Sequence, residues 1–389
     1  MFAKTAYLKL SLVCFSLVFT LVLLEICLRL FTPIPDNLAK LKSSSLFLHE
    51  NNPNVTFTYK SQGEFENQIF LNSYGFRDDE FKREKEPDTF RIAVLGDSQE
   101  EALQVTLFDT WQKVMVRRLS EKLKVKVESY NFGISGYGTD QQWLTLREKV
   151  WQFSPDMVIL AFSPNDVGDT YKNKLVRLEN GSIHVVSPEE RAGGNFLGKI
   201  VRKTYIYQLV VRAASGNEFA KKIVDKVRTK ILGFPKDERF FLSDAQLISG
   251  PFEIIASQKN PPQDVLDTWN IERILLADME KQAEAHGAKF MVTVNIPRAQ
   301  VDTSSWEQLR DQYHLAAGES LPYQINEVLG GICLDLGIPF YDGRLDAIEW
   351  KNENGILHFP NDAHYNINGN LFMGTKTADF ILKSKLIGE

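Results

Sequence analysis

The stretch Arg91–Ser98 (Arg-Ile-Ala-Val-Leu-Gly-Asp-Ser) constrains the fold of this chain more than any other segment. An apolar run of strand length ends there in Gly-Asp-Ser and leads into a polar segment suited to begin a helix. In an α/β fold, a residue between the end of a strand and the start of a helix lies in the crevice where open parallel sheets bind ligands. The stretch therefore predicts an α/β fold that presents Ser98 at a binding edge, although glycine and aspartate also form ordinary turns.

The same alternation of strand and helix patterns continues along the chain. Helices are predicted over residues 108–123, 140–153, 264–286 and 321–336, and further strands within 124–132, 155–166, 289–297 and 338–342. The segment that begins at Pro155 is almost wholly apolar, which is typical of a strand covered on both faces. Alternating strands and helices predict a doubly wound, parallel, five-stranded sheet whose loops meet at one edge.

Two of these loops bring polar groups to the same edge as Ser98. The loop Asn131–Asp140 is rich in glycine, so its backbone amides can approach a ligand closely, and the third strand delivers Asn165. Each loop also has a plain structural explanation. Asn165-Asp166 could form a turn, the glycine-rich loop a tight connection, and Asp362 a helix cap.

Four short motifs resemble the sequence blocks of the SGNH/GDSL hydrolase family. They are Gly96-Asp97-Ser98, Gly-Ile-Ser-Gly136, Pro164-Asn165-Asp166 and Asp362-Ala-His364. They occur in the order of the family, each at a predicted loop after a strand, and the resemblance covers about residues 90–170 and 285–385. The resemblance implies a flavodoxin-like three-layer fold and an esterase that needs no metal or other cofactor.

The resemblance also implies a role for each site residue. Ser98 is the expected nucleophile, His364 its base and Asp362 the acid that orients the histidine. The expected oxyanion donors are the backbone amides of Ser98 and Gly136 and the side-chain amide of Asn165. His358 is interpreted as a loop residue. Because the other histidines lack the spacing of metal ligands, no metal site is expected.

The chain departs from the commonest family pattern in two places. Asn361 stands three residues before the histidine, where an aspartate is more usual, so the orienting acid is expected at Asp362 instead. Gln99-Glu100-Glu101 follows the serine, where apolar or small residues are more usual. We expect these three residues to line the site and to favour a polar substrate.

Residues 10–31 predict a single transmembrane anchor. They are apolar except for Glu25 and Arg29, which are spaced to pair on one helix face, and they reach the ~20 residues that a helix needs to cross a bilayer. Two lysines in residues 1–9 favour a cytoplasmic start and place the rest of the chain outside the cytoplasm, in the periplasm or the extracellular space. A cleaved signal peptide is the alternative, but no small-x-small cleavage site follows the apolar core.

Three further segments complete the predicted organisation. Residues 32–88 are expected to be a linker and edge segment and residues 89–389 the hydrolase domain, which contains a helical insertion over 171–260. The insertion is interpreted as a helical cap with a solvated basic face. The alternative is a lid that touches the membrane surface through basic residues, which are Lys199, Arg202, Lys203 and Arg212.

Composition excludes several classes of function. A net charge of -5 makes nucleic acid an unlikely partner, and three cysteines allow neither a disulfide framework nor a cysteine metal site. The leading hypothesis is a membrane-anchored serine esterase that removes acyl groups from a carbohydrate or envelope glycan. The alternatives are an O-acyltransferase acting on an extracellular polysaccharide through the same residues, a lysophospholipase or thioesterase, and a non-catalytic binding protein on a hydrolase fold.

Overall fold

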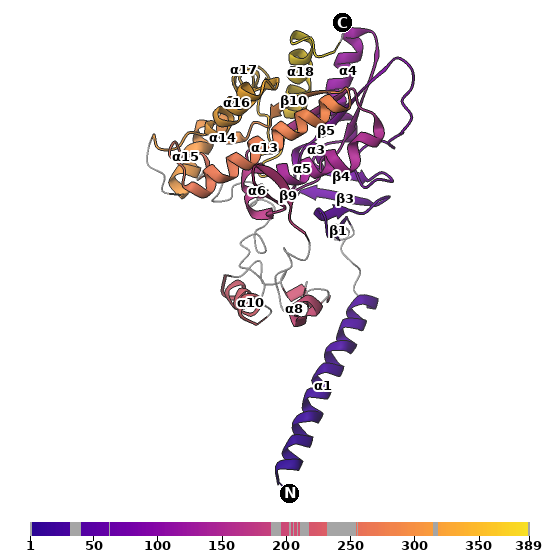
Figure 1. Cartoon of the computed structure of the whole chain (residues 1–389), viewed down its shortest axis with the longest axis vertical. Helices are drawn as coiled ribbons and strands as arrows, with labels where there is room; N and C mark the ends of the chain where they lie inside the picture. Colours follow the sequence, from indigo (N-terminus) through magenta and orange to yellow (C-terminus); the bar gives the residue numbers. More distant parts are fainter. Residues whose placement is uncertain are drawn as a thin grey trace. The chain divides into compact units, whose positions relative to one another are not determined.

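A computed structural model gives the fold of the chain (Figure 1). It describes residues 2–31, 40–61, 63–187, 196–201, 204, 206–207, 209–210, 218–231, 254, 256–313 and 318–387. The chain forms two compact units, a larger one within residues 39–188 and 244–389 and a smaller one within residues 1–38 and 189–243. The predicted catalytic residues all belong to the larger unit.

The larger unit is built on a five-stranded sheet in the order β11-β10-β7-β5-β6. The strands are β5 (Thr89–Leu95), β6 (Lys126–Asn131), β7 (Met157–Phe162), β10 (Lys289–Val294) and β11 (Phe340–Tyr341). Every neighbouring pair is parallel. The predicted doubly wound parallel sheet is therefore confirmed, and its strand order is that of the flavodoxin-like fold.

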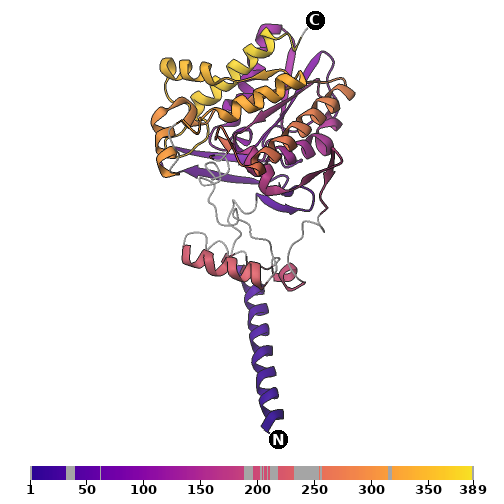
Figure 2. The ribbon, with the colours of Figure 1, turned by 60° about the vertical axis from the view of Figure 1, so that its left-hand side comes forward.

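Helices cover both faces of this sheet (Figures 1 and 2). One layer contains α4 (Trp111–Leu123), α17 (Arg344–Asn354) and α18 (Ile367–Lys383), and the other contains α5 (Thr139–Thr145), α6 (Asp166–Asn173), α13 (Gln263–Ala285) and α16 (Gln324–Leu336). The central strand β7 has no exposed residue, as its apolar sequence predicts. The helix predicted over 140–153 continues from α5 only as a π-helical turn over Leu146–Val150 and a 3-10 turn over Trp151–Phe153.

Two hairpins precede the sheet in the larger unit. They are β1 (Leu41–Ser44) with β2 (Leu48–Asn51), and β3 (Thr56–Ser61) with β4 (Phe65–Phe70). A turn with a positive φ at Gly75 follows β4. Both hairpins lie within residues 32–88, for which the sequence predicts a linker and edge segment. Strands as short and polar as β1 and β2 leave no clear sequence pattern, because they pair through their backbones.

The smaller unit contains α1 (Phe2–Phe31), α8 (Phe196–Val201) and α10 (Glu218–Lys230). The carboxylate of Glu25 accepts a hydrogen bond from the amide of Ile206, over 3.0 Å. A search of the described residues finds no helix with the length and apolar character needed to cross a membrane.

The segment predicted as a helical insertion is only partly helical. It begins with the end of α6 and a hairpin of β8 (Val176–Glu179) and β9 (Ser182–Val185), and α8 and α10 come after them. The side chains of the four basic residues named for the membrane lid, Lys199, Arg202, Lys203 and Arg212, lie outside the described residues. The choice between cap and lid stays a prediction.

Candidate active site

Ser98 lies at the carboxyl edge of the sheet, three residues after the last residue of β5, and begins the one-turn helix α3 (Ser98–Glu101). Asp97 caps this helix: its carboxylate accepts from the amide of Gln99 over 2.9 Å, while Glu100 accepts from the amide of Asp97 over 3.0 Å. A Cβ at position 96 would lie 2.0 Å from Glu100 Oε2, so only glycine fits there. The Gly-Asp-Ser sequence thus makes a tight, capped turn that leaves Ser98 half-buried.

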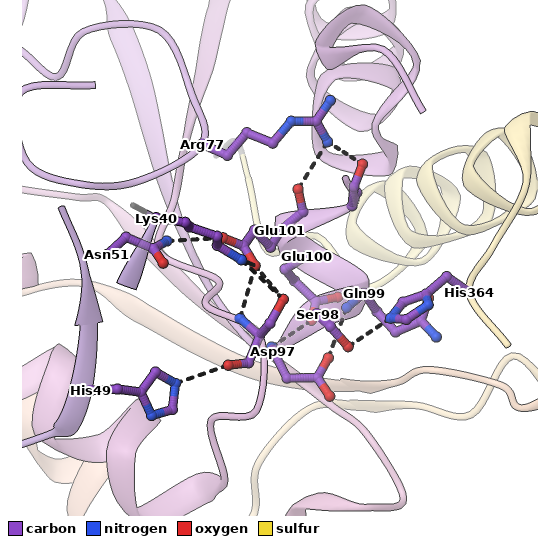
Figure 3. A network of polar contacts seen from close by, with 12 residues as sticks. Lys40, His49, Asn51, Arg77, Asp97, Ser98, Gln99, Glu100, Glu101 and His364 are labelled. Atoms are coloured by element: carbon purple, nitrogen blue, oxygen red, sulfur yellow. Dashed lines mark hydrogen bonds and ion pairs between the residues drawn. The ribbon is translucent and has the colours of Figure 1, made fainter. Parts of the chain in front are cut away.

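His364 lies between Ser98 and Asp362 and bonds both of them. Figure 3 shows its contact with Ser98. The His364 Nε2 lies 2.8 Å from Ser98 Oγ, and the Nδ1 is hydrogen-bonded to Asp362 Oδ1. Because a carboxylate only accepts, Nδ1 carries the proton and Nε2 is left to accept from the serine. Burial alone would raise the pKa of Asp362, but the hydrogen bonds from the side chain and the backbone of His364 hold that pKa below its ordinary value.

The spacing of two residues between Asp362 and His364 works because the carboxylate turns back on its own loop. Asp362 Oδ1 also accepts from the backbone amide of His364, over 2.9 Å. Asn361, at the position of the more usual aspartate, is exposed, and its backbone N–H donates to Glu64 Oε1. The alternative of Asp362 as a helix cap is wrong, because Asn366 caps α18.

Two side chains that the sequence did not single out as supports hold the loop that carries His364. The side chain of Gln99 accepts from the amide of Tyr365 over 3.2 Å and donates to the carbonyl of Ala363 over 3.5 Å. Arg298, the first residue of the short helix α14 (Arg298–Val301) after β10, donates to the carbonyls of Phe359, Pro360 and Asp362. The only sequence signal for Arg298 is its place after a strand, at the same edge of the sheet.

The expectation that Glu100 and Glu101 line the site is wrong. Both side chains are fully buried, at 0% exposure, whereas Gln99 lines a cavity beside His364. Their partners lie in the interior: Glu100 accepts from Trp111 and Asn295, and Glu101 accepts from Lys40 and Asn51. The polar run after Ser98 is therefore evidence about the interior and carries no information about the substrate.

The three expected oxyanion donors differ in what surrounds them. Gly136 is exposed, with a φ of +78°. Within the described residues, the amides of Ser98 and Gly136 donate to no other group. The Nδ2 of Asn165 donates to Asp97 over 3.0 Å and to Asp169 over 3.1 Å. Both hydrogens of the Asn165 amide group are therefore bonded to carboxylates. One of these two hydrogen bonds must break before the amide can donate to an oxyanion.

A cavity of about 420 Å³ lies against His364, Asn165 and Gln99. Its apolar lining includes Ile254, Trp306, Leu309, Pro322 and Ile325, and its amide side chains include Asn295, Gln308 and Gln312. The residues of this wall between Ser305 and Gln312 come from α15 (Thr303–Gln312). The volume and the mixed lining are typical of a small-molecule site.

His358 is buried away from this cavity, as a loop residue. It donates from Nε2 to the carbonyl of Ile296 over 2.9 Å, and its burial lowers the pKa of the ring to about 3. Among the described residues, no group of three His, Cys, Asp or Glu side chains is placed to hold a metal ion.

Comparisons with known proteins were made for both the sequence and the structure. The sequence matches no family model and no curated protein. The structure is similar to the psychrotrophic esterase EstA from Pseudoalteromonas sp. (12% identity, 76% of this chain and 98% of that chain, TM-score 0.37). It is also similar to the acetyl xylan esterase AlAXEase (12% identity, 76% of this chain and 99% of that chain, TM-score 0.38). A third similar structure is the lipase/acylhydrolase from Enterococcus faecalis (11% identity, 76% of this chain and 96% of that chain, TM-score 0.39). The solved structures that this chain resembles thus include proteins described as esterases and acylhydrolases.

Proposed function

We propose that this protein is a serine ester hydrolase of the SGNH/GDSL type. The observation that carries the proposal is the hydrogen-bonded chain from Ser98 through His364 to Asp362, at the sheet edge where α/β proteins bind ligands. A nucleophile, a base and a carboxylate that orients the base are the side chains that acyl transfer needs. Turn formation alone would not bring these three residue types together in this order.

The reaction proceeds through an acyl-enzyme. Ser98 Oγ attacks the ester carbonyl while His364 Nε2 takes the hydroxyl proton, and the imidazolium then gives that proton to the departing alcohol. Water repeats the two steps in reverse, which releases the acid and restores Ser98. Asp362 accepts from Nδ1 throughout and stabilises the imidazolium.

The amides of Ser98 and Gly136 and the side chain of Asn165 are the proposed donors to the oxyanion of each tetrahedral intermediate. The first two already lack other acceptors within the described residues. Loss of one donor typically lowers turnover by ~100-fold or more.

The proposed substrate is an acyl ester on a carbohydrate. The cavity beside His364 supports this proposal, because it combines the indole of Trp306 with several side-chain amides. A sugar ring offers apolar C–H faces to an aromatic ring and hydroxyl groups to amides. Esters with longer acyl chains are a second candidate, favoured by Leu309, Ile325 and the other apolar lining residues.

We also propose that residues 10–31 anchor the protein in a membrane, with the hydrolase outside the cytoplasm. The apolar sequence supports this proposal, and α1 leaves large apolar side chains exposed, among them Leu12, Phe15 and Leu23. Protease protection in sealed membrane vesicles tests the orientation. Digestion of the hydrolase domain from the cytoplasmic side would contradict it.

A chain-length series of nitrophenyl esters, measured on the full-length protein in detergent, tests the enzymatic proposal. The unaltered protein should hydrolyse them at least ~1,000-fold faster than Ser98→Ala. Equal rates for the two proteins would rule out the proposed function. A preference for acetyl esters, with acetate released from acetylated glycans, supports the carbohydrate substrate, and a preference for long chains supports the second candidate.

The substitution Asp362→Asn tests the orienting acid. An asparagine at this position fits the space but cannot accept the Nδ1 proton in the same way, so turnover should fall by ~1,000-fold or more while the melting temperature stays within a few degrees. Asp335→Asn, at an exposed aspartate of α16 that does not line the cavity, is the control and should leave turnover unchanged. A mild effect of Asp362→Asn would mean that another acid orients the histidine.

A further inference from the structure

The glycine-rich loop Gly133–Gly138, here termed the oxyanion loop, is held by residues from the start of the larger unit. These residues belong to the N-terminal hairpin, defined here as Lys40–Asn51, which includes β1 and β2. The hairpin and the oxyanion loop are about ninety residues apart in the chain, as the separation of 86 residues between His49 and Ser135 shows. None of the motifs that resemble the hydrolase family includes a hairpin residue.

Glu101 is the buried connection between the hairpin and the loop. Its carboxylate accepts from Lys40 Nζ over 2.6 Å and from Asn51 Nδ2 over 2.9 Å (Figure 3). On the loop side it accepts from the backbone amide of Ser135 over 3.0 Å and from the Ser135 hydroxyl. Ser135 is the residue directly before Gly136, so this carboxylate fixes the backbone on one side of the expected oxyanion donor.

His49 fixes the next peptide unit. Its Nε2 lies 2.9 Å from the carbonyl oxygen of Ser135 and must donate, because a carbonyl only accepts. The Ser135 carbonyl and the Gly136 N–H belong to one planar trans peptide and point in opposite directions. A contact that fixes the direction of the carbonyl therefore fixes the direction of the Gly136 N–H as well.

This peptide needs an external contact because of the residue that follows it. Gly136 has a φ of +78°, and glycine adopts positive and negative φ at similar cost, so the backbone alone does not select one orientation of the peptide. A further contact supports the position of His49. Its ring packs edge-on against Tyr137, with centroids 5.2 Å apart, and the Tyr137 hydroxyl donates to the His49 carbonyl over 3.0 Å.

We infer that His49 is a positioning residue that sets the direction of the Gly136 N–H, and that the N-terminal hairpin is thereby part of the oxyanion hole. The inference rests on the proposed function, in which this N–H binds the oxyanion. His49 acts through the Ser135–Gly136 peptide and takes no part in proton transfer, which His364 performs. Because the oxyanion forms only in the transition state, a misdirected N–H should lower kcat and leave KM nearly unchanged.

The experiment compares His49→Phe with His49→Gln in the full-length protein. Phenylalanine keeps a ring against Tyr137 but cannot donate, whereas the glutamine amide can. His49→Phe should lower kcat for nitrophenyl acetate about tenfold, less than the ~100-fold that outright loss of a donor costs, with KM within about twofold. It should raise the Ki of phenylboronic acid, whose tetrahedral adduct places an oxygen in the same hole, by the same factor as it lowers kcat/KM. In His49→Gln, both kcat and the Ki of phenylboronic acid should return most of the way to the values of the unaltered protein.

His286→Phe is the matched control. One ring nitrogen of His286, Nδ1, also bonds a backbone carbonyl, the Gln282 carbonyl at 2.8 Å. Because His286 lies outside the site, its substitution should change neither kcat nor the Ki of phenylboronic acid. Unchanged kcat in His49→Phe, or a loss that His49→Gln fails to restore at an equal melting temperature, would overturn the inference. Failure of the proposed function is recognised separately, because the unaltered protein would then be no faster than Ser98→Ala.

Discussion

Glu100 and Glu101 are neighbours in the chain and equally buried, yet they lie in opposite electrostatic environments. Glu100 accepts hydrogen bonds from neutral donors, the indole of Trp111 over 3.1 Å and the amide of Asn295 over 3.1 Å. Burial, followed by the nearby charge of Asp97, raises the pKa of Glu100 to about 8. Burial would also raise the pKa of Glu101, but the charge and hydrogen bond of Lys40 hold it below its ordinary value.

The difference shows that the two sides of α3 are stabilised by different means. On the side of Glu100, the turn that presents Ser98 rests on a carboxyl group that keeps its proton at neutral pH. On the side of Glu101, the turn rests on an ion pair with the N-terminal hairpin, in which Lys40 Nζ lies 2.6 Å from Glu101 Oε2. The same carboxylate also accepts from the Ser135 amide of the oxyanion loop. The nucleophile is therefore supported from one side by the interior of the sheet and from the other by a segment outside it.

The largest expected effect comes from removal of the cation that pairs with Glu101. Lys40→Met leaves a buried carboxylate without its partner and should lower the free energy of unfolding by about 3–5 kcal/mol in urea denaturation. The double substitution Lys40→Met with Glu101→Gln removes both charges and should recover most of that loss. If the single and double variants were equally destabilised, the packing of Lys40 would matter and its charge would not.

A rise in pH should destabilise the protein in part through Glu100. A carboxyl with a folded pKa of about 8 and an ordinary value near 4.5 binds more protons in the folded state between these values, so stability is full at low pH and falls as pH rises through this window. Between pH 5 and pH 9, the free energy of unfolding of Glu100→Gln should fall by up to ~4 kcal/mol less than that of the unaltered protein, since one pKa unit corresponds to ~1.4 kcal/mol. Unfolding free energies at pH 5 and pH 9 measure the difference. Parallel pH profiles for the two proteins would contradict a protonated Glu100.

A fall in pH should act in the opposite sense through Glu101. Its folded pKa lies below the ordinary value, so its contribution is present above about pH 4.5 and is lost as the carboxylate is protonated at lower pH. The free energy of unfolding should therefore fall between pH 5 and pH 3. The double variant Lys40→Met with Glu101→Gln should lack this loss. An equal loss in the double variant would assign the acid sensitivity to other carboxylates.

The smallest expected effect is that of Gln99, whose side chain faces outward from the same turn. Gln99→Ala removes its contacts with Ala363 and Tyr365, so the loop that carries His364 loses one support. Turnover should fall about threefold to tenfold, equivalent to ~1 kcal/mol, with little change in stability. Gln263→Ala, at an exposed glutamine that begins α13 and does not line the cavity, is the control. A fall larger than that of His49→Phe would mean that the base loop depends on Gln99 more than the oxyanion loop depends on the hairpin.

The sequence by itself determined the parts of the protein whose signals are local. The strands β5, β7 and β10 are largely apolar runs, and the Gly-Asp-Ser turn is a capped helix start encoded by consecutive residues, so both could be predicted from short windows. The order of motifs similarly indicated which loops reach the sheet edge, and Ser98, His364 and Asp362 lie there as a linked group. Residues 36–53 gave no such signal, because their strands are four residues long and polar.

Only the tertiary structure decided which polar residues face the substrate and which support the site from inside. Glu100 and Glu101 are the same residue type at adjacent positions, so the local sequence does not distinguish them. Their partners distant in sequence, Asn295 and Lys40, do: the pKa of Glu100 is raised and that of Glu101 is lowered. The contacts of His49 with Ser135 and of Arg298 with the base loop likewise join segments far apart in the chain. A hydrogen bond across such a separation depends on how whole elements pack, and that packing leaves no periodic pattern in the sequence.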